Sequence, residues 1–173
     1  MRFSAATVVV FSSIVALGCT TTPKLTVDPT INVYYVIDKG VPTDSDAKQV
    51  DAKQIEQRDQ VGTSLSESLF SALKRHGINS TPLRAQGDFK PSAKNYLLVV
   101  KITRYDAGNK AARMLVGFGA GSASMDSHFE LSSAPGKVVD QGDPSIASGR
   151  DWRFIVQKTT EIISSSVERS LAK

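Results

Sequence analysis

The stretch Asn95-Tyr-Leu-Leu-Val-Val-Lys-Ile-Thr-Arg-Tyr105 is the strongest strand signal in the chain, and it decides the fold class. β-Branched and aromatic residues fill it, which is typical of strands. Alternate apolar positions from Leu98 to Ile102 share one face, whereas Lys101 and Thr103 lie on the other. The second face is also apolar in its first half, so we expect both faces to be covered there.

Further strands are predicted on both sides of this stretch. Apolar and polar residues alternate from Ala123 to Leu131, which indicates a strand with one buried and one solvated face. Ala134-Pro-Gly136 predicts a turn into a strand at Lys137–Asp140, and the two strands would form a hairpin. Towards the N-terminus, Ile31–Ile37 reads as a strand and Ile78–Leu83 as a short one.

Two segments carry apolar residues at helical spacing. The first begins near Thr43–Ala47, at a sequence that resembles a capping box, and ends at Gly77, a left-handed C-cap. The second runs from about Gly149 to Leu171, with Ser148 as the first residue of a possible capping box. This order of elements predicts an α+β fold, with a mostly antiparallel sheet of four to five strands and two long helices packed on one face.

The N-terminus has the build of a secretory signal peptide, with a positive start and an apolar run over Ala5–Leu17. That run is shorter than the about 20 residues that a membrane-spanning helix needs. It ends in Val15-Ala-Leu-Gly-Cys19, which resembles the lipobox of bacterial lipoproteins, although Ala16 stands where that motif most often has Leu. Cys19 is the only cysteine in the chain. The alternative is an ordinary secretory signal followed by an incidental cysteine.

A lipidated Cys19 would anchor the protein in a membrane without spanning it, because several acyl chains hold stably. The predicted organisation is a lipoprotein signal peptide at 1–18, the lipidated cysteine and a tether at 19–30, and a single α+β periplasmic domain at 31–173. Aspartate after the cysteine is associated with inner-membrane retention, and Thr20 stands there instead. We therefore expect a lipid anchor on the periplasmic face of the outer membrane.

The glycine-rich stretch after Arg113 allows three interpretations: a phosphate-binding loop, a membrane-inserting segment, or a bend between strands. Its glycines, Gly117, Gly119 and Gly121, do not complete a dinucleotide or Walker pattern, and a strand rather than a helix is predicted to follow them. The uncharged run is too short to cross a bilayer. A bend is favoured, with Phe118 as the one large side chain available to a neighbouring surface.

The run from Asn95 to Tyr105, followed by Arg113-Met-Leu-Val-Gly-Phe-Gly-Ala-Gly-Ser-Ala123, a strand and a hairpin, resembles Gram-negative envelope lipoproteins grouped as domain of unknown function 4410. The resemblance covers roughly Val33 to Leu171. It implies an envelope location and a fold type, and it brings no catalytic residue.

The sequence predicts no catalytic residue and no cofactor. It also predicts no metal site, because its two histidines, His76 and His128, lack metal-ligand spacing. His76 is expected to be a last-turn helix residue, and His128 to lie on a solvated strand face beside Asp126 and Glu130. Without residues 1–18 the net charge falls from +4 to about +3, too little to indicate nucleic acid.

We expect a non-catalytic interaction or assembly component that contacts the membrane through its lipid and binds other envelope proteins. The alternative is a periplasmic module that binds an anion or a glycan at the glycine stretch. The predicted ligand or partner contacts are Arg104, Arg113, Gly117, Phe118, Gly119 and Gly121.

Overall fold

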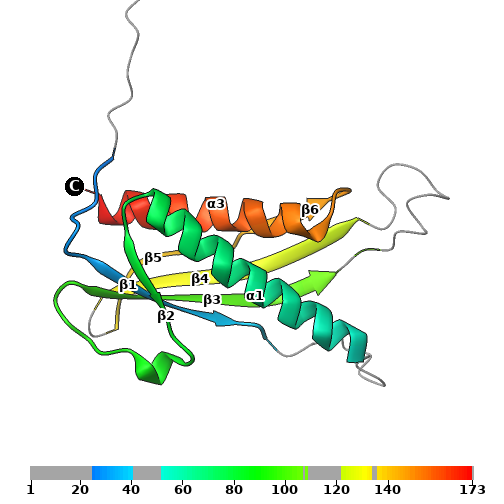
Figure 1. The fold of residues 1–173 in the computed structure, drawn as a ribbon, viewed down its shortest axis with the longest axis horizontal. Helices are drawn as coiled ribbons and strands as arrows, with labels where there is room; N and C mark the ends of the chain where they lie inside the picture. Colours follow the sequence, from blue (N-terminus) through cyan, green and yellow to red (C-terminus); the bar gives the residue numbers. More distant parts are fainter. Residues whose placement is uncertain (1–24, 41–51, 107, 109–121, 134–135, 173) are drawn as a thin grey trace, which may run out of the picture.

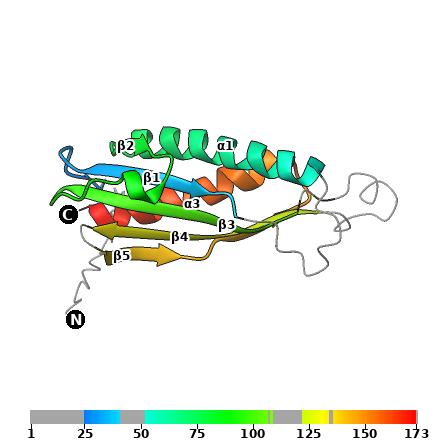
Figure 2. The ribbon, with the colours of Figure 1, turned by 90° about the horizontal axis from the view of Figure 1, so that it is seen from below.

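The computed structural model describes residues 25–40, 52–106, 108, 122–133 and 136–172. This part of the chain forms a six-stranded sheet with two long helices on one face (Figures 1 and 2). In chain order the elements are β1 (Asn32–Asp38), α1 (Ala52–Arg75), β2 (Asn79–Pro82), the short 3-10 helix η1 (Gln86–Asp88), β3 (Asn95–Asp106), β4 (Ala123–Ser133), β5 (Lys137–Gly142), β6 (Ser145–Ser148) and α3 (Trp152–Leu171).

The sheet is mixed. Its strand order is β2-β1-β3-β4-β5, and β6 pairs with the first residues of β4. β1 is parallel to both β2 and β3, whereas β4 is antiparallel to β3, β5 and β6. The prediction of an α+β fold is confirmed, but the prediction of a mostly antiparallel sheet of four to five strands is wrong.

Two physical reasons explain the difference. The chain returns through α1 between β1 and β2, and a helical crossover brings the second strand back parallel to the first. The strand after the hairpin turn is also interrupted at Asp143 and Pro144, so β4 pairs with β5 along one half and with β6 along the other.

The core lies between the sheet and the two helices. Alternate residues of β1, β3 and β4 point towards the helices, as the period-two pattern predicts. A β-bulge between Ile102 and Arg104 shifts the register, and Tyr105 packs against the core beyond it. The core residues that are at most 2% exposed include Val33, Tyr35, Leu98, Val100, Ile102, Met125, Leu131, Leu65, Leu69, Leu73, Ile155, Ile163 and Val167.

The helix ends follow local capping chemistry. Gly77 has a φ of +73° and ends α1 as predicted, and the amide of Ile78 donates to the carbonyl of Leu73. The predicted start of this helix lies outside the described residues. α3 begins one turn later than predicted, because Asp151 rather than Ser148 is its N-cap and accepts from the amide of Arg153. Neither described helix is both long enough and apolar enough to cross a membrane.

The sheet face turned away from α1 and α3, here named the open face, carries no long helix of the described chain (Figure 2). Near the start of β1 and β3 this face is apolar, because Tyr34 pairs with Leu97 and Val36 pairs with Val99. Phe89 from the β2–β3 connection packs edge-on against Tyr34, with ring centroids 5.7 Å apart. This connection supplies part of the cover that the sequence predicts for the second face, and Leu97 and Val99 stay partly exposed.

Candidate functional site

Most of the predicted site residues lie outside the described residues, namely Cys19, Arg113, Gly117, Phe118, Gly119 and Gly121. The remaining one, Arg104, is exposed on β3 and stands opposite Asp126 of β4. Since Asp126 alternates with the buried residues of β4, this pair belongs to the open face. The roles predicted for the lipid anchor and for the glycine stretch remain predictions.

Polar side chains gather on the half of the open face that lies towards the end of β3. Lys101 is paired with His128 in the β3–β4 register. The Nδ1 atom of His128 lies 2.8 Å from a carboxylate oxygen of Asp143. The hydroxyl of Ser145 donates to Asp126 at 2.6 Å. This half of the open face is therefore charged, whereas the half near the start of β1 is apolar.

The partner of His128 differs from the acids that neighbour it in sequence. Asp126 and Glu130 share its face as expected, but the contact comes from Asp143, in the connection between β5 and β6. Sequence reasoning missed Asp143, because only the break between β5 and β6 places it beside β4. The signal available for it was the Gly142-Asp-Pro144 turn sequence.

The chemistry of this pair is that of a solvated surface. The side chains of His128 and Asp143 are 39% and 81% exposed, so water screens their interaction. Within the described part of the chain, the ring of His128 contacts Asp143, and no three His, Cys, Asp or Glu side chains gather where they could hold a metal ion.

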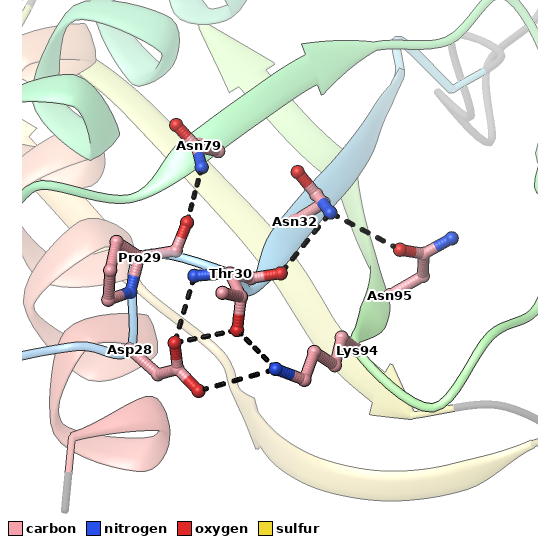
Figure 3. Close-up of polar contacts among 7 residues, drawn as sticks. All are labelled: Asp28, Pro29, Thr30, Asn32, Asn79, Lys94 and Asn95. Carbon is pink, nitrogen blue, oxygen red and sulfur yellow. Dashed lines mark hydrogen bonds and ion pairs between the residues drawn. The ribbon is translucent and has the colours of Figure 1, made fainter.

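A second polar cluster fixes the segment through which the N-terminal part of the chain joins the domain (Figure 3). A carboxylate oxygen of Asp28 accepts from the amide and the hydroxyl of Thr30, at 2.9 and 2.6 Å. Lys94 donates to the same hydroxyl at 2.6 Å and lies 3.8 Å from the other oxygen of Asp28. The side chain of Asn79 donates to the carbonyl of Pro29 at 2.7 Å.

This cluster defines one end of the molecule, here named the tether end. Val27 forms a β-bridge with Ala172, so the segment leaves the domain beside the C-terminus (Figure 1). Sequence reasoning assigned residues 19–30 to a tether, whereas residues 27–30 are hydrogen-bonded to or paired with the domain. The contacts join positions far apart in sequence, so periodicity gives no sign of them.

The opposite end of the molecule carries buried and acidic groups. The pKa of Tyr105, at the end of β3, is raised by burial first and then by the negative charges of Asp106 and Asp151. Asp151 begins α3, which starts at this end (Figure 1). The two ends thus differ: Asp28, Thr30 and Lys94 contact one another at the tether end, whereas Tyr105 lies near the charges of Asp106 and Asp151 at the other.

Solved structures share this fold. PelC from Paraburkholderia phytofirmans, described as a dodecamer, is 16% identical, with a TM-score of 0.53 over 87% of this chain and 93% of PelC. A dodecameric variant of PelC is 15% identical, with a TM-score of 0.57 over 88% of this chain and 96% of the variant. At these identities the likeness shows the fold alone. No curated protein sequence matches the chain.

The sequence itself matches a defined family over most of the described domain. The matched residues are 30–147, which run from the tether end of β1 through the hairpin into β6. The match covers well over half of the chain and includes the open face, together with Thr30, Asn79 and Lys94 of the tether-end cluster. The chain therefore belongs to the family described as Domain of unknown function (DUF4410).

Proposed function

We propose that this protein is an outer-membrane-anchored periplasmic lipoprotein whose domain is a non-catalytic interaction or assembly component of the cell envelope. One observation carries the proposal. The segment that follows the lipobox-like Cys19 joins the domain at a single, hydrogen-bonded end, where Val27 is bridged to Ala172. A lipid on Cys19 would therefore hold the tether end, and not an arbitrary face, towards the membrane.

The length of the tether limits how far the domain stands from the bilayer. Seven residues separate Cys19 from Val27. At roughly 3.4 Å per residue, a fully extended chain of this length reaches about 27 Å. The end of the molecule opposite to the tether end would then be directed into the periplasm, where it meets partners rather than lipid.

The open face supports the assembly part of the proposal. Tyr34, Leu97 and Val99 are only partly covered on it, and Lys101 and Arg104 continue the same face as a charged area. Interfaces commonly combine an apolar centre with a polar rim. The two PelC structures that share the fold are described as dodecamers, and we propose that copies of this chain associate through the open face.

The anchor is tested by fractionating cell envelopes that contain the parent protein or Cys19→Ala. We expect the parent in the outer membrane and the variant in the soluble periplasm, because the variant has no acyl chain. Thr20→Asp should move the protein to the inner membrane, and Thr22→Asp is the matched control. Retention of Cys19→Ala in membranes would show that the anchor proposal is wrong.

Assembly is tested by chemical crosslinking in intact cells, followed by identification of the products. We expect crosslinked multimers of the chain, and we expect Val99→Glu to abolish them because it places a charge within the apolar half of the open face. Lys137→Glu, at an exposed position of β5, is the matched control and should leave them unchanged. If the chain is crosslinked only to unrelated proteins and no multimer forms, the self-assembly part of the proposal is wrong.

A further inference from the structure

Exposed basic side chains gather at the tether end, and they come from separate parts of the chain. Lys74 and Arg75 lie in the last turn of α1, and Arg169 lies in the last turn of α3. Lys90 lies in the connection between β2 and β3, and Lys137 begins β5. All of these side chains are exposed, and none forms an ion pair within the described part of the chain.

Contacts and strand pairing bring these residues to one end of the molecule. The Nδ1 atom of His76 lies 2.8 Å from a carboxylate oxygen of Glu168, so the ends of α1 and α3 are in contact. The side chain of Asn95 donates to the carbonyl of Lys90 at 3.0 Å, which holds the connection at the start of β3. Lys137 reaches the same end, because β5 begins where β4 ends and β3 begins (Figure 2).

The carboxylates at this end are less exposed than the basic groups. Asp28 lies 3.8 Å from Lys94, and Glu168 contacts His76. Asp140 accepts from two serine hydroxyls of α3. These three acids are partly buried, and among the described acids near this end only Asp88 of η1 is exposed. The outer surface of the tether end is therefore mainly basic.

Helix electrostatics explain only part of this arrangement. A basic residue in the last turn of a helix interacts favourably with the partial negative charge there, which accounts for Lys74, Arg75 and Arg169 without any partner. The same effect does not account for Lys90 and Lys137, which lie in a loop and at the start of a strand. A surface that attracts anions accounts for all of them.

We infer that these basic residues dock the tether end on an anionic phospholipid surface. The inference rests on the proposed lipid anchor, because the anchor would hold this end beside a bilayer. Each Lys or Arg close to an anionic bilayer strengthens association about fivefold. The attraction acts through water over about 8 Å at physiological ionic strength, so exposed and hydrated side chains supply it.

Docking and anchoring would act together. A few basic residues alone bind a bilayer weakly and reversibly, so Cys19→Ala is still expected to be released when cells are fractionated. In the lipidated protein the short tether keeps this end near the surface, which raises its effective concentration there. Docking would then hold the domain against the bilayer, with the opposite end directed away from it (Figure 1).

Vesicle flotation of the full-length Cys19→Ala protein tests the inference without an acyl chain. Phosphatidylcholine vesicles are compared with vesicles in which about a third of the lipid is phosphatidylglycerol, at low ionic strength. The apolar run over Ala5–Leu17 contributes to binding in both, so the preference between them is the measurement. We expect binding to the anionic vesicles to be about tenfold tighter or more, and added salt to abolish the difference.

Equal binding to the two kinds of vesicle overturns the inference. This outcome is distinct from a failure of the proposed anchor. The flotation experiment uses a protein that carries no lipid, whereas the anchor is tested by fractionating the parent protein from cells.

Two double variants locate the surface. Lys74→Glu with Lys90→Glu should weaken binding to anionic vesicles about tenfold or more and leave binding to neutral vesicles unchanged. Lys39→Glu with Lys158→Glu changes the net charge equally at exposed positions away from the tether end, and this matched control should change binding less than about threefold. Equal losses in the two double variants would attribute binding to net charge and overturn the inference. If the first double variant does not fold, Lys90→Glu in its loop gives the same test, with an expected loss of about fivefold.

Discussion

Among the described glycines that were compared, Gly40 is the one at which an added Cβ atom would make the closest contact. Its φ is +65°, and a Cβ atom there would lie 2.5 Å from the carbonyl oxygen of Ile102. We expect Gly40→Ala to lower the free energy of unfolding by about 2–4 kcal/mol, since left-handed backbone strain and a clash with backbone add together. Urea denaturation measures this change.

Gly87→Ala is the control for that experiment. Gly87 lies in η1, and a Cβ atom there would meet nothing within 4 Å. Its replacement should change the free energy of unfolding by less than about 1 kcal/mol. A Gly40→Ala protein as stable as Gly87→Ala would contradict the close approach of Gly40 to β3.

Two tyrosines, the buried Tyr35 and the partly buried Tyr105, make the free energy of unfolding depend on pH in the alkaline range. Burial is the main cause that raises the pKa of Tyr35 and of Tyr105 above the ordinary value near 10. Below about pH 10 both phenols are protonated in the folded and unfolded chains, so their contribution is fully present. As the pH rises through the folded pKa values the unfolded chain releases these protons first, and stability is lost.

The variant that carries both Tyr35→Phe and Tyr105→Phe should therefore lose stability less steeply than the parent between about pH 9 and about pH 11. It starts from a lower value, by about 1 kcal/mol, because the hydroxyl of Tyr35 donates to the carbonyl of Ser66 at 3.1 Å. Denaturation at a series of pH values measures both effects. Tyr34→Phe on the open face is the control, and equal slopes for parent and double variant would contradict the assignment.

Among the secondary-structure elements, β5 is linked to α3 by the carboxylate of Asp140. A single oxygen of Asp140 accepts from the hydroxyls of Ser166 and Ser170, at 2.7 and 2.9 Å. Asp140→Ala should lower the free energy of unfolding by about 1–3 kcal/mol and speed amide hydrogen exchange in β5. Glu161→Ala, at an exposed ion pair on α3, should leave both nearly unchanged, and an equal effect of the two changes would contradict this role.

The sequence predicts which face of each strand is buried. It does not predict which strands pair with one another. The alternation in Ala123–Leu131 identifies the buried side because burial repeats every second residue. The parallel pairing of β1 with β3 has no such signature, because it depends on where β2 inserts at the edge of the sheet. For the same reason, the sequence placed His128 on the correct face and missed Asp143 as its partner.

For the whole molecule, the boundary of the folded domain lies nearer to the N-terminus than the start of β1. Val27 packs against the core and pairs with Ala172, and Pro29 accepts from Asn79. A protein that begins at Leu25 should keep the parent's thermal midpoint. One that begins at Ile31 should be less stable by about 2–3 kcal/mol, because it loses these contacts. Equal stability of the two proteins would show that residues 25–30 belong to the tether and not to the folded domain.

The candidate sites differ in whether the sequence alone predicts them. A lipobox is local, so Cys19 and its neighbours are sufficient to predict an anchor. The tether-end cluster joins Asp28 to Lys94, so it does not exist before the chain is folded. The sequence therefore predicts where the protein is located, but it does not predict the surfaces through which the protein would act.

The bridge between Val27 and Ala172 also makes the fold a candidate for circular permutation. A short linker would join the two original ends, and the chain could be reopened at Gly87, on an exposed turn where a side chain meets nothing. Such a permutant would keep the same core and sheet order. A lipid attached to its new N-terminus would hold the β2–β3 connection towards the bilayer instead. The position of the proposed anchor could thus be changed without changing the fold.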